Sequence, residues 1–168
     1  NVLDIGAGYG RLAYRMVEVL PNINKVFCAD GVAISTFIAE YYLSFRNVNE
    51  KVIAVPIYDL EQEVLKNNSI DLAINIHSFS ECSLESVEWW LNLLRKYEIK
   101  YLMVVPNDEM HVKELFTYPN KDGQSFNYSQ LLKERGYQLI FEQPKYMNTL
   151  IQRYGVSPKY HYLFELIL

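Results

Sequence analysis

Apolar and polar positions follow two different periods along the chain, and segments of the two kinds alternate. Short apolar runs predict strands, and longer stretches with an apolar residue every three or four positions predict helices. The predicted strands are Val2–Ile5, Lys25–Asp30, Lys51–Pro56, Ile70–His77, Lys100–Pro106, Tyr137–Glu142 and Tyr160–Leu168. The predicted helices are Gly10–Leu20, Val32–Arg46, Asp59–Lys66, Ser83–Tyr97 and Tyr128–Arg135. This alternation predicts an α/β fold with a mostly parallel sheet covered on both faces.

The predicted helix Gly10–Leu20 carries Ala13, Met16, Val17 and Leu20 on one face, and two further helices carry an apolar stripe that we expect to face the core. The stripes are Ile34, Ile38, Tyr41 and Phe45 in one helix, and Leu84, Val87, Leu91 and Leu94 in the other. Asp59, with Gln62 three residues later, is typical of a capping box. The last two strands are separated by too little regular helix for a crossover, so we expect them to form an antiparallel pair.

The first predicted strand runs directly into a glycine-rich stretch, "VLDIGAGYGRLA" from Val2 to Ala13. Glycines let the chain turn tightly and let a ligand approach the backbone closely, and the amides of such a turn favour an electron-rich group. The dinucleotide fingerprint G-x-G-x-x-G needs a third glycine at position 11, where the chain has Arg11. The spacing is instead G-x-G-x-G, with Asp4 ahead of Gly6. That carboxylate suits a ligand with an ammonium group better than a pyrophosphate.

Composition narrows the class of protein without identifying it. The 168 residues are 50% hydrophobic and carry a formal net charge of -4, which suits one globular domain, residues 1–168. No basic block is present, so we expect no nucleic-acid partner. The apolar runs are too short to span a membrane, and we expect a cytoplasmic protein whose Cys28 and Cys82 are reduced thiols. The chain begins inside a predicted strand, so we expect it to be truncated at its N-terminus.

At this point the sequence resembles the class I S-adenosylmethionine-dependent methyltransferases. "VLDIGAGYG" is similar to their first motif, and the order of later features extends the resemblance over nearly the whole chain. The resemblance implies a Rossmann-like, doubly wound sheet in the order 3-2-1-4-5-7-6 with the seventh strand antiparallel. It also implies S-adenosylmethionine as cofactor, and helices before the first strand that this chain does not contain.

The resemblance also implies which residues hold the cofactor. Gly6, Gly8, Gly10 and Asp4 would surround its methionine portion. Asp30 closes the second strand, where the family places an acid on the two ribose hydroxyls, and Gly31 follows it. Val32 and Tyr58 are placed to flank the adenine ring, and Asp59 to bind its amino group. Asp59 is explained about equally well as a helix cap.

The stretch after the fourth strand, "NIHSFSECS", falls where the family places acceptor-facing or catalytic groups. Transfer of a methyl group to a hydroxyl needs alignment and a base for the proton. His77 is the best candidate for that base because its pKa lies near neutrality. Glu81, four residues later, could orient His77, take the proton itself or hold a cation. Both residues also have interpretations without a function in catalysis. His77 is explained as a polar group at a strand end, and Glu81 as a charge at a helix N-terminus.

The same stretch is similar, less specifically, to a group of bacterial sugar O-methyltransferases. The predicted reaction is therefore methyl transfer to a hydroxyl of a small-molecule sugar or glycan acceptor. Asn107, Asp108 and His111 could line the acceptor pocket, and Asp108, Glu109 and His111 are too loosely spaced for us to expect a metal site. Three alternatives stay open: another small-molecule acceptor, a non-catalytic cofactor-binding module of a glycan-assembly protein, and a nicotinamide-dependent oxidoreductase. The oligomeric state is not predicted.

Overall fold

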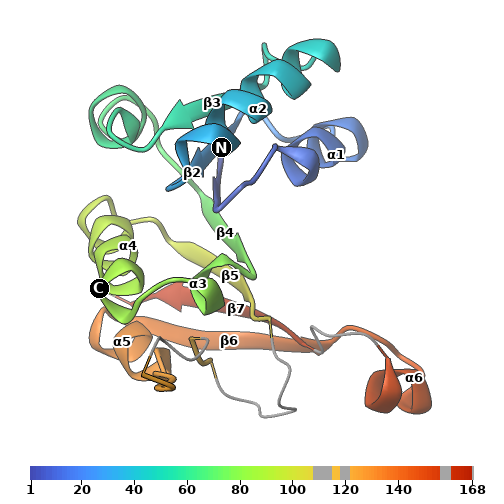
Figure 1. The fold of residues 1–168 in the computed structure, drawn as a ribbon, viewed down its shortest axis with the longest axis vertical. Coiled ribbons are helices and arrows are strands. Elements are labelled where there is room, and N and C mark those ends of the chain that lie inside the picture. Colours follow the sequence, from blue (N-terminus) through green and yellow to red (C-terminus); the bar gives the residue numbers. More distant parts are fainter. Residues whose placement is uncertain (108–114, 118–121, 156–159, 168) are drawn as a thin grey trace. The chain divides into compact units, whose positions relative to one another are not determined.

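A computed structural model describes residues 1–107, 115–117, 122–155 and 160–167 (Figure 1). Within these residues the strands form a seven-stranded sheet in the order β3-β2-β1-β4-β5-β7-β6. Their bounds are β1 Val2–Ile5, β2 Val26–Asp30, β3 Val52–Pro56, β4 Leu72–Ile76, β5 Tyr101–Val105, β6 Tyr137–Pro144 and β7 Tyr160–Leu166. β7 pairs antiparallel with both β5 and β6, so the predicted Rossmann-like α/β order and the antiparallel seventh strand are confirmed.

The chain divides into two compact units, Asn1–Ile74 and Asn75–Leu168, and the boundary falls within β4. In the first unit β1, β2 and β3 pair in parallel, with Asp4 opposite Cys28 and Asp30 opposite Pro56. Its helices are α1 Arg11–Val19, α2 Ala33–Phe45 and the π-helix η1 Leu60–Leu65. All four residues of β1 are buried. A strand in a parallel sheet that is covered on both faces needs such nearly continuous burial, and β1 and β2 both have it.

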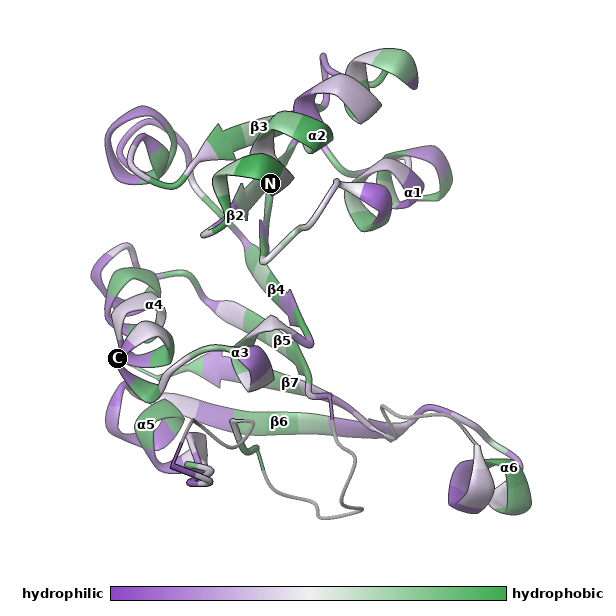
Figure 2. Ribbon diagram, in the orientation of Figure 1, coloured by the Kyte–Doolittle hydropathy of each residue, from purple (hydrophilic) through white to green (hydrophobic). Residues whose placement is uncertain are grey.

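The apolar stripe predicted for α2 is wrong. Ile34, Ile38, Tyr41 and Phe45 are between 46% and 72% exposed, whereas Ala39 and Leu43 are buried. Green, apolar colour occurs near both ends of α2 (Figure 2). Because the helix carries apolar residues nearly all round, periodicity alone could not select the face that packs on the sheet. Ala39 and Leu43 are the α2 residues that pack into the core.

The second unit is built on β5, β7 and β6, whose antiparallel register is interrupted by a shift between Leu139 and Phe141 of β6. Its helices are α3 Ser78–Glu81, α4 Leu84–Lys96, α5 Ser129–Glu134 and α6 Thr149–Tyr154. The inward residues predicted for α4 are confirmed for Val87, Leu91 and Leu94, each fully buried. Ser83 caps α4, because its hydroxyl accepts a hydrogen bond from the Ser86 amide.

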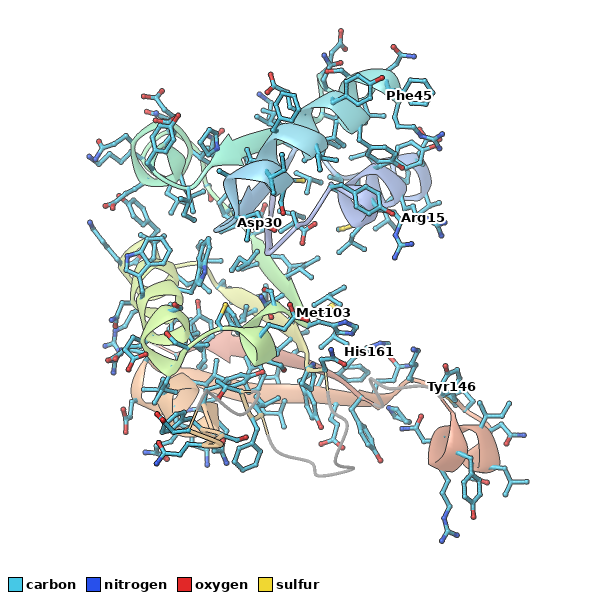
Figure 3. All side chains as sticks on the ribbon, viewed as in Figure 1. Arg15, Asp30, Phe45, Met103, Tyr146 and His161 are labelled. Atoms are coloured by element: carbon cyan, nitrogen blue, oxygen red, sulfur yellow. The ribbon has the colours of Figure 1, made fainter. Side chains whose placement is uncertain are left out.

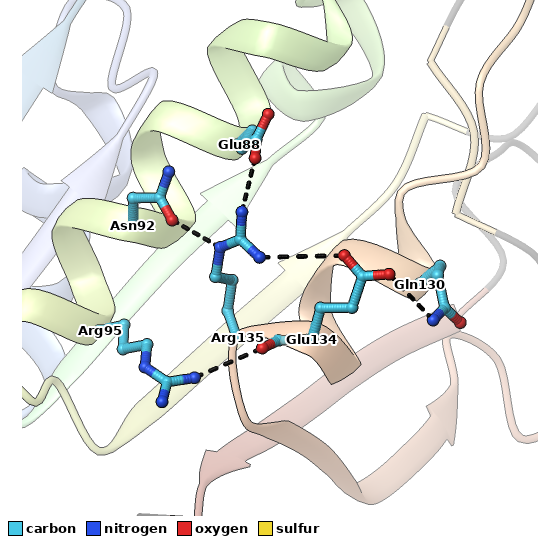
Figure 4. Close-up of polar contacts among 6 residues, drawn as sticks. All are labelled: Glu88, Asn92, Arg95, Gln130, Glu134 and Arg135. Carbon is cyan, nitrogen blue, oxygen red and sulfur yellow. Dashed lines mark hydrogen bonds and ion pairs between the residues drawn. The ribbon is translucent and has the colours of Figure 1, made fainter.

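An arginine joins α4 to α5 (Figure 4). Arg135 Nη2 forms an ion pair with Glu88 Oε1 at 2.5 Å, and its Nε donates to Asn92 Oδ1. Arg95 Nη1 donates to the Glu134 carbonyl at 3.4 Å. These contacts fix the short helix α5 against the longer α4.

One local prediction for the remaining helices is wrong, and one helix was not predicted. The Asp59 side chain accepts no capping hydrogen bond, and the helix after it, η1, is a π-helix. α6 carries no buried residue, so no apolar stripe marked it in the sequence. Among the described residues, no helix has the length and apolar content that a membrane span needs.

Candidate functional site

The turn after β1 has a backbone that favours glycine. Gly6, Gly8 and Gly10 have φ values of 70°, 56° and 80°, in the left-handed region. A Cβ atom on Gly10 would lie 3.2 Å from Leu43 Cδ2 of α2, whereas one on Gly8 would meet no atom within 4 Å. Gly10 is therefore needed for packing as well as for its backbone angle, and Gly8 leaves open space above the turn.

Asp30, at the end of β2, ties this turn to the second strand (Figure 3). Its Oδ2 accepts a hydrogen bond from the Gly8 amide at 2.9 Å, and its Oδ1 accepts one from the Val32 amide at 2.8 Å. A carboxylate has about four acceptor sites, so these two bonds leave capacity for a ligand's hydroxyl groups. Asp30 is thus both a structural anchor for the turn and a candidate ligand-binding group.

The other amides of the turn are also engaged within the protein. The Gly6 and Ala7 amides donate to the Ala29 carbonyl at 2.8 and 3.3 Å, and the Gly10 amide donates to the Ala7 carbonyl at 3.0 Å. The expectation that these amides would favour an electron-rich ligand group is therefore wrong for Gly6, Gly8 and Gly10. Since they do not form an anion cradle, the turn is also a poor site for a pyrophosphate.

Asp4 is a buried carboxyl group in β1. It is 3% exposed, and its Oδ2 has no hydrogen-bond partner within the described part of the chain. Burial, and secondarily the negative charge of Asp30, raise the pKa of Asp4 to about 7. Burial and the neighbouring Asp4 also raise the pKa of the Cys28 thiol. A buried carboxylate without a partner is costly, and an ammonium group beside it would lower that cost.

The remaining predicted cofactor residues lie at the ends of β2 and β3. Because Asp30 pairs with Pro56, the residues that follow β2 and those that follow β3 leave the sheet at the same edge. Gly31 and Val32 are exposed, Tyr58 is 79% exposed, and Asp59 is half-buried. The first unit therefore presents two apolar side chains and two carboxylates around one strand edge.

The two predicted catalytic residues belong to the second unit. His77 has a φ of 70° at the junction of β4 and α3, and its amide donates to the Val105 carbonyl at 2.8 Å. Its Nε2 is buried without a partner among the described residues. Burial lowers the pKa of His77, the negative charge of Glu81 opposes that effect, and Lys145 adds to it. Glu81 is exposed at the last residue of α3.

Sequence reasoning missed the residues that hold the β4–α3 junction. Asn75 is 1% exposed; its Oδ1 accepts from the Phe79 amide at 3.0 Å, and its Nδ2 donates to the Ser78 hydroxyl. The buried Ser80 hydroxyl accepts from the Asn107 amide at 3.1 Å. Asn75, the one polar residue within the apolar run "LAINI", was the available signal, since a buried amide needs partners. These contacts fix the backbone that carries His77.

The described residues contain no group of three or more histidine, cysteine, aspartate or glutamate side chains placed to hold a metal. Asp108, Glu109 and His111 lie outside the described residues, so the structure says nothing of them. Asn107 is half-buried and follows β5.

No protein-family model and no curated protein matches this sequence. Solved structures do match in fold. The methyltransferase domain of bacterial CtHen1-C matches with a TM-score of 0.71 and 14% identity, over 100% of this chain and 90% of that one. A SAM-dependent methyltransferase from Aquifex aeolicus matches with a TM-score of 0.68 and 15% identity, over 99% of this chain and 81% of that one.

Two further matches bear on what the fold can do. Sp1610 of Streptococcus pneumoniae, a protein assigned to tRNA (m1A22) methylation, matches with a TM-score of 0.65 and 15% identity, over 98% of this chain and 63% of that one. The [4+2]-cyclase SpnF matches with a TM-score of 0.69 and 13% identity, over 99% and 74%. A tRNA-directed relative in fold removes the support for excluding a nucleic-acid partner, and a cyclase shows that the fold is not confined to methyl transfer.

The structural neighbours include methyltransferases that depend on S-adenosylmethionine. S-adenosylmethionine as the cofactor of this chain is consistent with that likeness in fold. The chain therefore has the Rossmann-like fold of the class I methyltransferases.

Proposed function

We propose that the first unit binds S-adenosylmethionine at the edge formed by the ends of β1, β2 and β3. Asp30 binds the ribose hydroxyls with the acceptor capacity that Gly8 and Val32 leave free. Asp4 faces the cofactor's ammonium group, directly or through water. Val32 and Tyr58 contact the adenine ring, and Asp59 accepts a hydrogen bond from the adenine amino group.

One observation carries this proposal: two carboxylates adjoin a turn whose glycine amides are already engaged, and the buried Oδ2 of one of them, Asp4, has no hydrogen-bond partner among the described residues. Such a site has acceptors to offer and few donors. It therefore suits a ligand rich in donors, with an ammonium group and two adjacent hydroxyls, better than one that carries phosphates.

Calorimetric titration with S-adenosylhomocysteine tests the binding step. We expect binding by the unmodified chain and a loss of about tenfold or more in affinity in Asp30→Ala, since hydrogen bonds to a charged group contribute about 1.5–3 kcal/mol each. Glu50→Ala, at an exposed position of the same unit, is the matched control and should bind as the unmodified chain does. Absence of binding, or tighter binding of NADH than of S-adenosylhomocysteine, would rule the site out.

We further propose that the chain transfers a methyl group to a hydroxyl of a sugar or glycoconjugate. The bound cofactor supplies an electrophilic methyl on a sulfonium. The acceptor oxygen would form the new O–CH3 bond as the S–CH3 bond breaks, with the electron pair of that bond left on the sulfur of S-adenosylhomocysteine. His77 or Glu81 would take the proton that the acceptor loses. Burial, which includes the Nε2 atom, lowers the pKa of His77. The imidazole is therefore neutral at neutral pH and able to accept a proton.

A transfer assay with labelled methyl donor distinguishes the acceptor classes. We expect incorporation into sugar hydroxyls, a reduction of about 10²–10⁴-fold in rate in His77→Asn, and a smaller loss in Glu81→Gln. Incorporation into tRNA instead would fit the likeness to Sp1610 and replace the sugar acceptor. Cofactor binding without transfer to any acceptor would favour the alternative of a non-catalytic binding module.

A further inference from the structure

The second unit contains a cavity of about 490 Å3 that the proposed methyl transfer does not use. It lies between α5 and the strands β6 and β7. Its lining residues are Leu115, Ser129, Lys133, Tyr137, Gln138, Leu139, Tyr162 and Phe164. Its volume falls in the range of about 300–1,000 Å3 that is usual for small-molecule sites.

The floor of the cavity is apolar. Leu139 pairs with Phe164 across β6 and β7, and Tyr162 lies two residues from Phe164 on the same face of β7. Tyr137 is fully buried, and its hydroxyl donates to the Ile99 carbonyl at 2.6 Å. Since that hydroxyl is engaged and the ring is fully buried, Tyr137 supports the floor from beneath without adding a polar group to it. This floor suits an aliphatic or aromatic body.

Polar groups occupy one side of the cavity. Ser129 and Lys133 are one turn apart on α5, so they lie on the same helix face. The Lys133 ammonium is exposed and forms no ion pair with any residue the structure describes. One unpaired positive charge beside an apolar floor complements an amphipathic anion.

We propose that this cavity binds a medium-chain monocarboxylate, with its apolar chain on Leu139, Tyr162 and Phe164 and its carboxylate at Lys133. The site is independent of cofactor binding, because all its residues belong to the second unit and none is among the proposed cofactor or catalytic residues.

The test compares octanoate, octanol and octylamine by calorimetric titration of the full chain. We expect octanoate to bind most tightly, octanol more weakly, and octylamine most weakly. Lys133→Gln should reduce octanoate affinity by about fivefold and leave octanol affinity unchanged, as expected for one partly exposed ion pair. Lys51→Gln, which removes an exposed lysine from the first unit, is the matched control.

A second variant tests the location of the site. Leu139 is 49% exposed, so Leu139→Trp should fold while filling the cavity, and it should abolish binding of both octanoate and octanol. Amide chemical-shift changes on octanoate addition should concentrate in α5, β6 and β7. Equal binding of octanoate and octylamine, or undiminished octanoate binding in Leu139→Trp, would overturn the proposal. Titration of Leu139→Trp with S-adenosylhomocysteine reads out the cofactor site separately.

Discussion

At the scale of single residues, Asp4 links the buried strand β1 to the pH dependence of stability. Its pKa is raised to about 7 by burial, so the folded state binds a proton that the unfolded state, with an aspartate pKa near 4, has released. A raised folded-state pKa stabilises at low pH. That contribution is lost as the pH rises from about 4 to about 7. The shift corresponds to roughly 4 kcal/mol, an order-of-magnitude value.

We predict that Asp4→Asn removes this loss, because an amide has no proton to release in that range. Asp4→Asn should be more stable than the unmodified chain at pH 8, by about 1–4 kcal/mol, and nearly equal to it at pH 4. Urea unfolding at several pH values measures the difference. Burial lowers the pKa values of His77 and His161, so these two histidines make stability rise with pH. Their contribution is the same in both proteins and cancels in the difference between them. Glu50→Gln is the control, and an equal difference at every pH would contradict the assignment.

The glycines of the β1 turn give a second prediction at this scale. Gly8→Ala should cost about 1–2 kcal/mol, the penalty for a left-handed backbone, because a Cβ there meets no neighbour. Gly10→Ala should cost more, because its Cβ would also press on Leu43 at 3.2 Å. Urea unfolding of the two variants checks the order, and Gly31→Ala, without a positive φ, is the control. A smaller cost at position 10 than at position 8 would show that Leu43 moves away freely.

At the scale of elements, Arg135 gives the third prediction. Its planar guanidinium binds Glu88 and Asn92 of α4 at once, from the end of α5. Arg135→Lys keeps the charge but loses this fork, so we expect a loss of about 1 kcal/mol, with Arg135→Met somewhat more damaging. Arg153→Lys, in α6, which carries no buried residue, should change stability little. An equally small effect of Arg135→Lys and Arg153→Lys would show that the fork contributes nothing.

The element scale also shows what could be predicted from sequence. Buried strands such as Val26–Asp30 and the "VLDIGAGYG" turn were predictable, because an apolar run that ends in glycine or acid has few alternatives in an α/β fold. The buried face of α2 was not, because large apolar residues also occupy its exposed side. The engaged amides of Gly6, Gly8 and Gly10 depend on Ala29 and Asp30 of the neighbouring strand. Such long-range partners leave no periodic signal.

At the scale of the whole molecule, the placement of β4 bears on cooperativity. β4 spans Leu72–Ile76, and the boundary between the two compact units falls after Ile74. The chain passes from one unit to the other within this strand, without a separate linker segment. We therefore expect the chain to unfold in one transition despite its division into two units.

The chain offers a separate probe in each unit. Trp89 and Trp90 are its two tryptophans and both lie in the second unit, so their fluorescence follows that unit alone. Cys28 is 3% exposed in the first unit, and in a Cys82→Ser background it is the sole thiol, so its labelling follows the first unit. We predict the same urea midpoint for both probes.

S-adenosylhomocysteine at about 100 times its Kd should raise both midpoints together, because binding to the folded state adds about 2.7 kcal/mol to a single cooperative transition. Movement of the Cys28 midpoint alone would show that the units unfold independently, and movement of neither would count against the cofactor site itself.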